Sequence, residues 1–322
     1  MKIIASATLA VISLFVAATA AAAATPLPSN VNDTVVLSPD FHQASCPQLP
    51  GIVRSAVRAA LRWDVQITAG LLRIFFHDCL PQGCDASIFL DGERRFGPNV
   101  SLQPRAEQLV DNIRVLVHAA CGPIVSCADI LALATRDAVN LASARAQRQL
   151  PAGSPAEISI LPGPYTTVDA LLGVFRRRGL GDAADLVALF GGHTVGKASC
   201  GVIRANDDFT RRLARQCSAA PARKQSLDVV TPDVFDNKYY EPRGVLASDQ
   251  GLADHPRTRP LVDAFAANQA AFFKQCAKSM VKLSSIRGAA GEIRRNSCFR
   301  PNGRIGVEED EELAATPAFQ WA

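Results

Sequence analysis

Apolar residues recur at intervals of three and four through most of the chain, and this spacing places them along one face of an α-helix. The sequence has no run that alternates strictly between apolar and polar residues, so we expect a mainly α protein. Loops are expected at 93–104, 143–164 and 228–236, and the second of these contains four prolines. Helices are predicted at 43–63, 106–121, 127–142, 167–178, 182–190, 207–217 and 260–283.

One further segment, 70–87, is predicted to be a helix that leads into a tight loop closed by Cys79 and Cys84. Arg73 and His77 are four positions apart, so both side chains lie on one face of this helix. Burial and the neighbouring cation both oppose protonation of His77. A neutral imidazole beside a guanidinium can accept a proton and have the resulting anion stabilised, so the pair is a candidate acid–base site. A buried structural histidine is the simpler alternative.

The composition suits one large globular unit or two packed lobes, because 48% of the 322 residues are hydrophobic and 20% are charged. The net charge of +4 is small, and the arginines are scattered without a basic run, so we do not expect nucleic-acid binding. Residues 1–24 contain Lys2, an apolar run and an alanine-rich end, which is typical of a secretory signal peptide. We therefore expect a secreted, soluble mature protein with no membrane contact.

The chain contains nine cysteines, and export would place them in a compartment where disulfides persist. Eight paired cysteines allow roughly a hundred connectivities, which the sequence alone cannot distinguish. Cys79 and Cys84 can close a small local loop. Cys276 shares one helical face with Phe272 and Met280, so we expect a buried free thiol there.

A second candidate site is His193, which follows Gly191 and Gly192 at the predicted end of a helix. Glycine leaves room for a flat cofactor to approach such a ring, and a haem iron needs one proximal nitrogen ligand. A ligating imidazole usually donates its other N–H to a carboxylate or a carbonyl group. Asp249 is a candidate for that carboxylate on its chemistry alone.

Several long motifs resemble those of the secreted plant (class III) haem peroxidases, and the resemblance extends from about Leu37 to Asn302. They read LLRIFFHDCLPQGCDAS, VSCADILALATRDAV, DLVALFGGHTVGKASC, TPDVFDNKYY and SDQ. The resemblance implies the haem peroxidase fold, with two helical lobes that enclose one haem b. It implies a signal peptide at 1–24, one domain at 25–302 and an acidic tail at 303–322, with a distal lobe at about 37–160 and a proximal lobe at about 161–302.

The resemblance also assigns roles to individual residues. His77 matches the distal acid–base histidine, Arg73 the distal arginine and Phe76 the aromatic residue beside them. His193 matches the axial ligand of the haem iron, and Asp249 matches its carboxylate partner. The remaining assignments are the pair that supports the distal histidine, Glu93 and Asn99, and the substrate residue at the haem margin, Pro162.

Two calcium sites and four disulfides follow from the same resemblance. The first calcium site comprises Asp78, Pro81, Gly83, Asp85 and Ser87. The second comprises Thr194, Asp228, Thr231, Val234 and Asp236. Without the resemblance, such Asp and Ser loops would be taken for ordinary turns. The implied disulfides are Cys46–Cys121, Cys79–Cys84, Cys127–Cys298 and Cys200–Cys217, which leave Cys276 unpaired.

The implied activity is reduction of hydrogen peroxide to water, coupled to two one-electron oxidations of a small aromatic donor of the phenolic type. It suggests roles in hydrogen peroxide catabolism, the response to oxidative stress and cell-wall or lignin metabolism, by a monomer in the wall or the vacuole. Two departures favour an alternative, a secreted calcium- or wall-polymer-binding protein with impaired turnover. A central segment usual in the family is missing between Leu141 and Pro164, and the run before Asp249 is about four residues short.

Two glycosylation sequons begin at Asn32 and Asn99. The first lies in a stretch expected to be exposed. The second conflicts with the inward role that the resemblance gives to Asn99, so we do not expect a glycan there.

Overall fold

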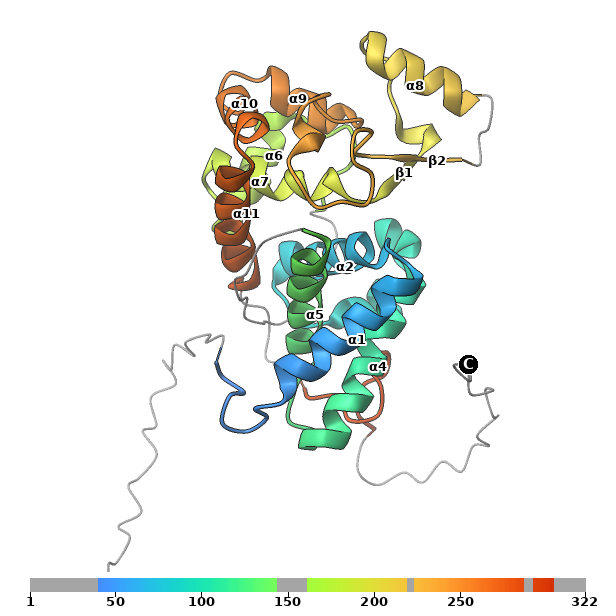
Figure 1. The fold of residues 1–322 in the computed structure, drawn as a ribbon, viewed down its shortest axis with the longest axis vertical. Helices are drawn as coiled ribbons and strands as arrows, with labels where there is room; N and C mark the ends of the chain where they lie inside the picture. The colour runs from blue at the N-terminus through green and yellow to red at the C-terminus, as the bar shows by residue number, and fades with distance from the viewer. Residues whose placement is uncertain (1–39, 144–160, 219–222, 287–291, 304–322) are drawn as a thin grey trace, which may run out of the picture. The chain divides into compact units, whose positions relative to one another are not determined.

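The computed structural model describes residues 40–143, 161–218, 223–286 and 292–303, and all of them belong to one compact unit (Figure 1). Four of the sequence predictions lie outside the described residues. These are the signal peptide at 1–24, the Asn32 sequon, most of the departure between Leu141 and Pro164, and the acidic tail from residue 304 onward.

The first group of helices packs around α5, most of whose residues are buried. Ser126 caps this helix by accepting a hydrogen bond from the Asp129 backbone N–H at 3.0 Å, which satisfies one of the free donors of the first turn. α1 and α2 both lie against α5, and α4 contacts α1, α2 and α5. The bounds are α1 Leu49–Trp63, α2 Ile67–Gln82, α4 Pro104–Cys121 and α5 Cys127–Ala142.

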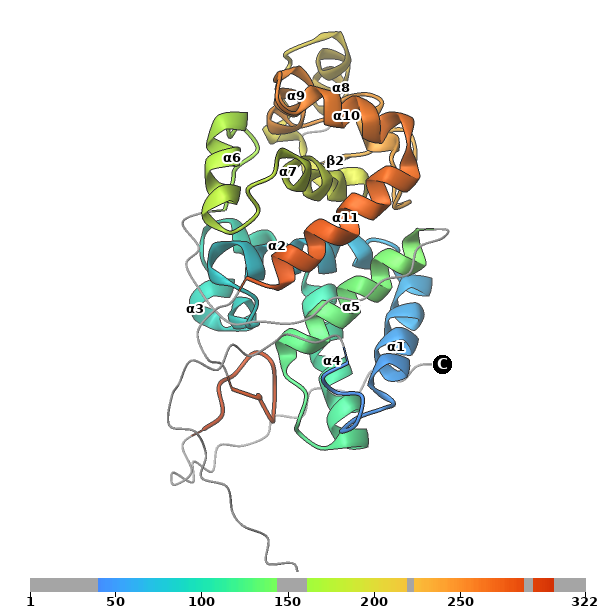
Figure 2. The ribbon, with the colours of Figure 1, turned by 90° about the vertical axis from the view of Figure 1, so that its left-hand side faces the viewer.

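A second group of helices packs around α7 and α11 (Figures 1 and 2). α7 begins at the cap residue Asp182, as predicted, and ends in the short 3₁₀-helix η4 that carries His193. α11 also contacts α2, so it joins the second group to the first. The bounds are α6 Val168–Arg177, α7 Ala183–Phe190, η4 Gly191–Thr194, η6 Lys238–Tyr240, α9 Ala247–Asp254, α10 Arg259–Ala267 and α11 Gln269–Ser284.

Two of the predicted elements were wrong. The segment 260–283 is not one helix, because Asn268 has extended backbone angles and caps α11 by accepting a hydrogen bond from the Ala271 backbone N–H. The segment 93–104 is not simply a loop: it includes the end of the short helix α3, Asp91–Arg94, and the 3₁₀-helix η2, Gly97–Ser101.

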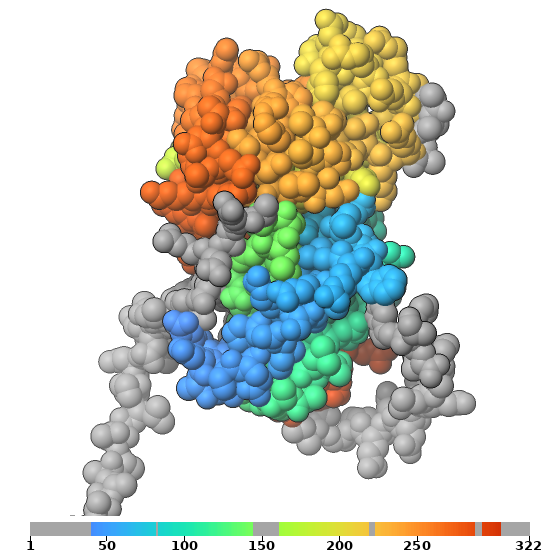
Figure 3. All heavy atoms as spheres, viewed as in Figure 1, coloured from blue at the N-terminus to red at the C-terminus, as the bar shows by residue number. Residues whose placement is uncertain are grey.

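A small module lies beside the second group and has its own apolar cluster around the Cys200–Cys217 disulfide. It contains a two-stranded antiparallel sheet that the sequence pattern did not predict. In Figure 3 its yellow atoms stand out at one edge of the surface. The elements are β1 Lys197–Ser199, η5 Cys200–Val202, α8 Asp208–Ser218 and β2 Lys224–Ser226.

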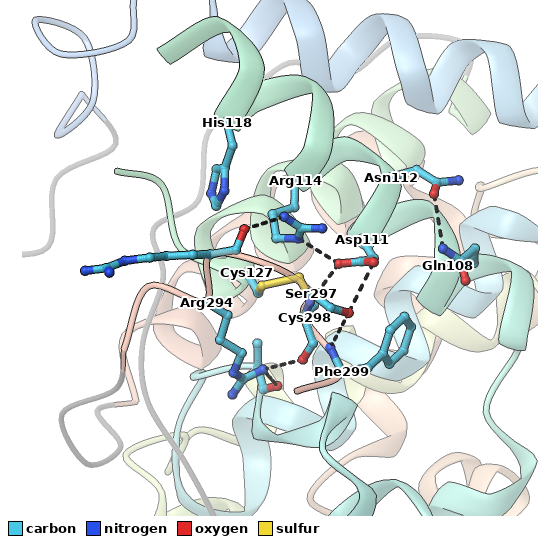
Figure 4. A network of polar contacts seen from close by, with 12 residues as sticks. Gln108, Asp111, Asn112, Arg114, His118, Cys127, Arg294, Ser297, Cys298 and Phe299 are labelled. Carbon is cyan, nitrogen blue, oxygen red and sulfur yellow. Dashed lines mark hydrogen bonds and ion pairs between the residues drawn. A yellow bond between two sulfur atoms is a disulfide. The ribbon is translucent and has the colours of Figure 1, made fainter. Parts of the chain in front are cut away.

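All four expected disulfides are present, and Cys276 is a buried free thiol, as predicted. The last described segment returns to α4 beside the Cys127–Cys298 disulfide (Figure 4). There one carboxylate oxygen of Asp111 accepts hydrogen bonds from Arg114 Nε and from the Cys298 backbone N–H, both at 2.7 Å. These contacts anchor the end of the domain to the first group of helices.

Within the described ranges, no helix is both long enough and apolar enough to cross a membrane.

Candidate active site

A continuous chain of hydrogen bonds orients His77 in α2. The Asn99 amide nitrogen donates to the Glu93 carbonyl oxygen at 3.0 Å, so the Asn99 amide oxygen is left to accept from His77 Nδ1 at 2.8 Å. His77 Nδ1 therefore carries the proton. On the other side of the ring, Arg73 Nε lies 3.4 Å from His77 Nε2, which is left as an acceptor. The ring nitrogen that faces the arginine is thus a free base.

The guanidinium of Arg73 is fixed by the loop that carries Asn99. Its terminal nitrogens donate to the carbonyl oxygens of Ser101 and Pro98, at 2.9 and 3.0 Å, and to the Ser101 hydroxyl at 2.9 Å. The 3₁₀-helix η2 therefore positions both the arginine and the residue that orients the histidine.

The electrostatics keep His77 neutral over a wide range of pH. Burial, and then the charge of Arg73, lower the pKa of His77 from 6.5 to about 4, although the hydrogen bond to Asn99 opposes this shift. Burial also lowers the pKa of Arg73. The sequence predicted that burial and the neighbouring Arg73 would both oppose protonation of His77, but it did not predict the lowered pKa of Arg73.

A series of aromatic rings connects His77 to His193. Phe76 lies 6.4 Å from the His77 ring and 6.3 Å from Phe175, ring centre to ring centre. Phe175 lies 6.3 Å from Phe190, which lies 5.5 Å from the His193 ring. In addition, α2 contacts η4, so the two histidines belong to one region although they are far apart in sequence.

His193 pairs with Asp249, as expected. The distance from His193 Nδ1 to Asp249 Oδ1 is 2.9 Å, and the Asp249 side chain is fully buried at the start of α9. An ionised carboxylate can only accept, so Nδ1 carries the proton and Nε2 is free to bind a metal. Burial lowers the pKa of His193, but the charge and hydrogen bond of Asp249 outweigh it, so the pKa is raised overall.

The two glycines before His193 have different roles, which the sequence did not separate. A Cβ on Gly191 would lie 2.3 Å from the Tyr240 hydroxyl oxygen and 2.4 Å from the Phe272 ring, so this glycine makes room for the protein's own core. A Cβ on Gly192 would meet nothing within 4 Å. Of the two glycines, only Gly192 leaves the open space that was predicted for both.

The side chains around the two histidines are in part accessible to water. Arg73 is exposed and the His193 side chain is 33% exposed, while burial lowers the pKa of Arg73. The chemistry of these residues, with a free Nε2 on His193 and a base beside a guanidinium, suits a haem.

The loop after His77 brings carboxylates together in a way that suits a cation. Asp78 is buried, and its Oδ2 accepts from the Ala86 backbone N–H, but its Oδ1 has no hydrogen-bond partner. Burial and the nearby Asp85 raise the pKa of Asp78 well above its usual value. Ser87 Oγ lies 2.7 Å from Asp85 Oδ1 and 2.9 Å from Glu93 Oε1. Pro81 lies in the last turn of α2, and Gly83 is the first residue after the helix.

All members of the second predicted cation site share one cluster of oxygens. Thr194 Oγ1 lies within 3.4 Å of Asp228 Oδ2, the Val234 carbonyl oxygen and Asp236 Oδ1. Thr231 Oγ1 lies 2.9 Å from Asp236 Oδ2 and 3.3 Å from Asp228 Oδ2. Two hydroxyl protons cannot satisfy all these contacts, so the cluster suits a hard cation with oxygen ligands.

Neither cluster is a conventional set of protein side-chain ligands. Among the residues that the structure describes, no group of three or more His, Cys, Asp or Glu side chains is arranged to hold a metal ion. Both candidate sites therefore depend on hydroxyl and carbonyl oxygens as well as carboxylates.

The structure adds one residue to the site that the sequence analysis missed, and it shows where Pro162 lies. The Tyr239 ring lies edge-on to His193 at 6.0 Å, and burial and the Asp249 carboxylate raise the pKa of Tyr239. The motif around Tyr239 was noticed but carried no chemical signal of its own.

Pro162 lies in the loop before α6, where the Pro164 carbonyl oxygen accepts from the Ser248 backbone N–H at 3.0 Å. This bond ties the loop to the residue next to Asp249.

This arrangement suits a haem peroxidase, and comparison with known proteins identifies the family. The peroxidase family matches residues 53–268, and the chain belongs to that family. It is 43% identical over 298 residues to cationic peroxidase SPC4 of Sorghum bicolor, with 82% of each chain covered. It is 39% identical to peroxidase 71 and 37% identical to peroxidase 12, both of Arabidopsis thaliana. Those matches cover 84% and 82% of this chain, and 91% and 82% of the relatives.

The chain is therefore an enzyme, a haem peroxidase that acts on hydrogen peroxide, as the sequence predicted. The alternative of a binding protein with impaired turnover is not favoured.

Proposed function

We propose that this peroxidase uses His77 as its acid–base residue, Arg73 to stabilise charge, and His193 with Asp249 to hold the haem. The observation that carries the proposal is the pair of hydrogen-bonded histidines, one with a free Nε2 beside Arg73 and one with its Nδ1 held by Asp249. When bound, the haem supplies the redox chemistry that cleaves the O–O bond of hydrogen peroxide.

His77 has the right protonation state to begin the reaction. Its Nε2 is unprotonated at neutral pH and can take a proton from hydrogen peroxide. The same nitrogen can then return the proton to the departing oxygen, which leaves as water. Arg73, fixed by three hydrogen bonds, stabilises the negative charge that develops during this transfer.

His193 would bind the haem iron through Nε2. The buried Asp249 carboxylate accepts from Nδ1, which makes the ring a more basic ligand and fixes its orientation. Phe76 would pack beside the haem on the side of His77. Glu93 supports this side indirectly, because its carbonyl oxygen holds Asn99.

The donor is proposed to be a small phenolic compound, oxidised in two one-electron steps at the haem margin near Pro162. The loop that contains Pro162 is tied to α9 beside Asp249, which supports a location next to the haem-binding residues. We further propose that the enzyme is secreted, acts as a monomer, and contributes to hydrogen peroxide catabolism and cell-wall metabolism.

Two calcium ions are proposed to brace the two histidines. Asp78 directly follows His77, and its Oδ1 lacks a hydrogen-bond partner, which an ion would supply. Thr194 directly follows His193, within the second cluster of oxygens. Binding of a hard cation by six to eight oxygens would require the backbone oxygens near Pro81, Gly83 and Val234 as well as the side chains.

The central test is the substitution His77→Leu in the haem-loaded protein. We expect the haem absorption band to be retained while the rate of reaction with hydrogen peroxide falls by about 10²–10⁴-fold, since this is the usual contribution of general acid–base catalysis. His255→Leu is a suitable control, because His255 pairs with Asp169 and lies outside the chain of hydrogen bonds around His77. An unchanged rate in His77→Leu would remove this residue from the mechanism.

A further inference from the structure

The run between Tyr240 and Asp249 reverses direction through two successive residues with left-handed backbone angles. Arg243 has φ +63° and Gly244 has φ +79°, and the Arg243 backbone N–H donates to the Tyr240 carbonyl oxygen at 3.2 Å. The sequence led us to expect that this short run would affect how Asp249 reaches His193. The contact is nevertheless made at 2.9 Å across this tight reversal.

Gly244 lies directly against the Asp249 side chain. A Cβ on Gly244 would be 2.3 Å from Asp249 Cβ and 3.1 Å from both Cγ and Oδ2. Three other glycines with positive φ are different: at Gly97, Gly122 and Gly179 a Cβ would meet nothing within 4 Å, and at Gly196 the nearest atom would be Ala69 Cβ at 3.1 Å. The close approach is therefore a property of Gly244 and not a general consequence of left-handed turns.

Asp249 has little freedom to move away. Its side chain is fully buried, Oδ1 accepts from His193, and Oδ2 accepts from the Leu246 backbone N–H at 3.3 Å. Its Cβ belongs to the first turn of α9, and this helix is packed closely against α6, because a Cβ on Gly251 would lie 3.3 Å from Val168. Any atom added at Gly244 must displace either the carboxylate or the start of α9.

We infer that Gly244 is a positioning residue, whose missing side chain gives the Asp249 carboxylate the space it needs to reach His193. This inference rests on the proposed function in one respect, namely that His193 binds the iron and Asp249 tunes it. It predicts that Gly244 matters through the geometry of the His193–Asp249 contact and not only through backbone strain.

The test is Gly244→Ala, with Gly179→Ala as the matched control, because both glycines have left-handed backbone angles. Gly179→Ala should lower the Tm by about 2–6 °C, the usual effect of a Cβ at positive φ, and leave the haem spectra unchanged. Gly244→Ala should lower the Tm by at least about twice that amount. In the ferrous haem-loaded protein it should also lower the iron–histidine stretching frequency towards that of Asp249→Asn, since a weaker hydrogen bond makes the ligand less basic.

A stretching frequency and a Tm loss in Gly244→Ala that match those of Gly179→Ala would overturn the inference. If Gly244→Ala does not fold, the double variant with Asp249→Gly decides, because Asp249→Gly lacks the Cβ that the alanine would meet. The added alanine should then cost no more than Gly179→Ala does, and a larger cost would overturn the steric argument. If Asp249→Asn leaves the stretching frequency unchanged, the proposed tuning of His193 by Asp249 fails, while the Tm comparison still tests the role of Gly244.

Discussion

The low pKa of His77 leads to a direct prediction about the acid limit of the enzyme. Burial and Arg73 lower this pKa from 6.5 to about 4, a difference worth about 3 kcal/mol between the two protonation states. Only the neutral ring can take a proton from hydrogen peroxide. The second-order rate constant with peroxide should therefore stay nearly constant from pH 8 to pH 5 and fall with a midpoint near pH 4.

The effect of the lowered pKa on the rate is already large in weakly acidic solution. At pH 5, about 90% of His77 is neutral with this pKa, whereas about 3% of an ordinary histidine would be neutral. The rate at pH 5 should thus be about 30-fold higher than an unperturbed histidine would allow. The measurement is a stopped-flow series between pH 3 and pH 8, with circular dichroism at each pH to exclude acid unfolding.

Variants of two arginines test the cause of the shift. Arg73→Gln removes the cation beside the ring, so the midpoint should move upward but remain below 6.5, because burial is the larger cause. Arg105→Gln is the control: its side chain is 78% exposed and pairs with Asp64, so the midpoint should not move. A midpoint near 6.5 in the unmodified protein, or no change in Arg73→Gln, would refute this account of the site.

Three further predictions concern the cations, an ion pair and glycosylation. Burial raises the pKa of Asp85 to about 6, so without a cation the stability that this group contributes is present below about pH 4 and is lost as the pH rises through 6. Removal of calcium with a chelator should therefore lower the Tm much more at pH 8 than at pH 5. Equal losses of Tm at the two pH values would contradict the proposed site. Lys282→Met leaves the buried Asp185 without its cation, although Gln275 and Ser279 still donate to it, and should lower the free energy of unfolding by about 2–4 kcal/mol in chemical denaturation. Lys238→Met at an exposed pair should leave the free energy of unfolding nearly unchanged. Mass spectrometry of glycopeptides should find no glycan on Asn99 of the folded enzyme, because both amide atoms are hydrogen-bonded and the residue is 2% exposed; a glycosylated active fraction would contradict its role.

The residues with chemistry could be found from the sequence because their signals are local. Arg73 and His77 share a helical face, and the helix that precedes His193 has a clear cap at Asp182 and an end at Gly191. The short spacing suggested the Cys79–Cys84 pair, and chemistry alone suggested Asp249 as the partner of His193. The other three disulfides join residues that periodicity cannot pair. These came from the resemblance to the family, and the structure contains them.

The features that the sequence did not predict depend on tertiary contacts or on very short elements. The strands β1 and β2 have three residues each, too few for an alternating pattern to show. The break at Asn268 lies between two segments that both have helical periodicity, and only its capping bond reveals it. The role of Gly191 is set by Tyr240 and Phe272, which come from other parts of the chain. The pattern of one segment contains none of this information.

The environment of His77 is built from parts of the chain that are far apart in sequence. Asn99 holds the ring, Glu93 holds Asn99 through its carbonyl oxygen, and the Glu93 side chain accepts from Ser87 in the loop after α2. That loop is fixed from outside, because Arg294 Nη1 donates to the Ala86 carbonyl oxygen at 2.7 Å.

The same nitrogen of Arg294 donates to the Cys298 carbonyl oxygen at 2.8 Å, and Cys298 is joined to Cys127 at the start of α5. The orientation of the base is therefore linked to a disulfide whose two cysteines, Cys127 and Cys298, are 171 residues apart in sequence. A helix of α2's length could form locally with His77 on the correct face. Such a helix alone could not determine which nitrogen of His77 carries the proton, because that depends on Asn99 and on the loop after α2. The loop in turn is held by Arg294, near the end of the domain. We conclude that the tautomer of His77, and with it the capacity to accept a proton, is a property of the completed fold.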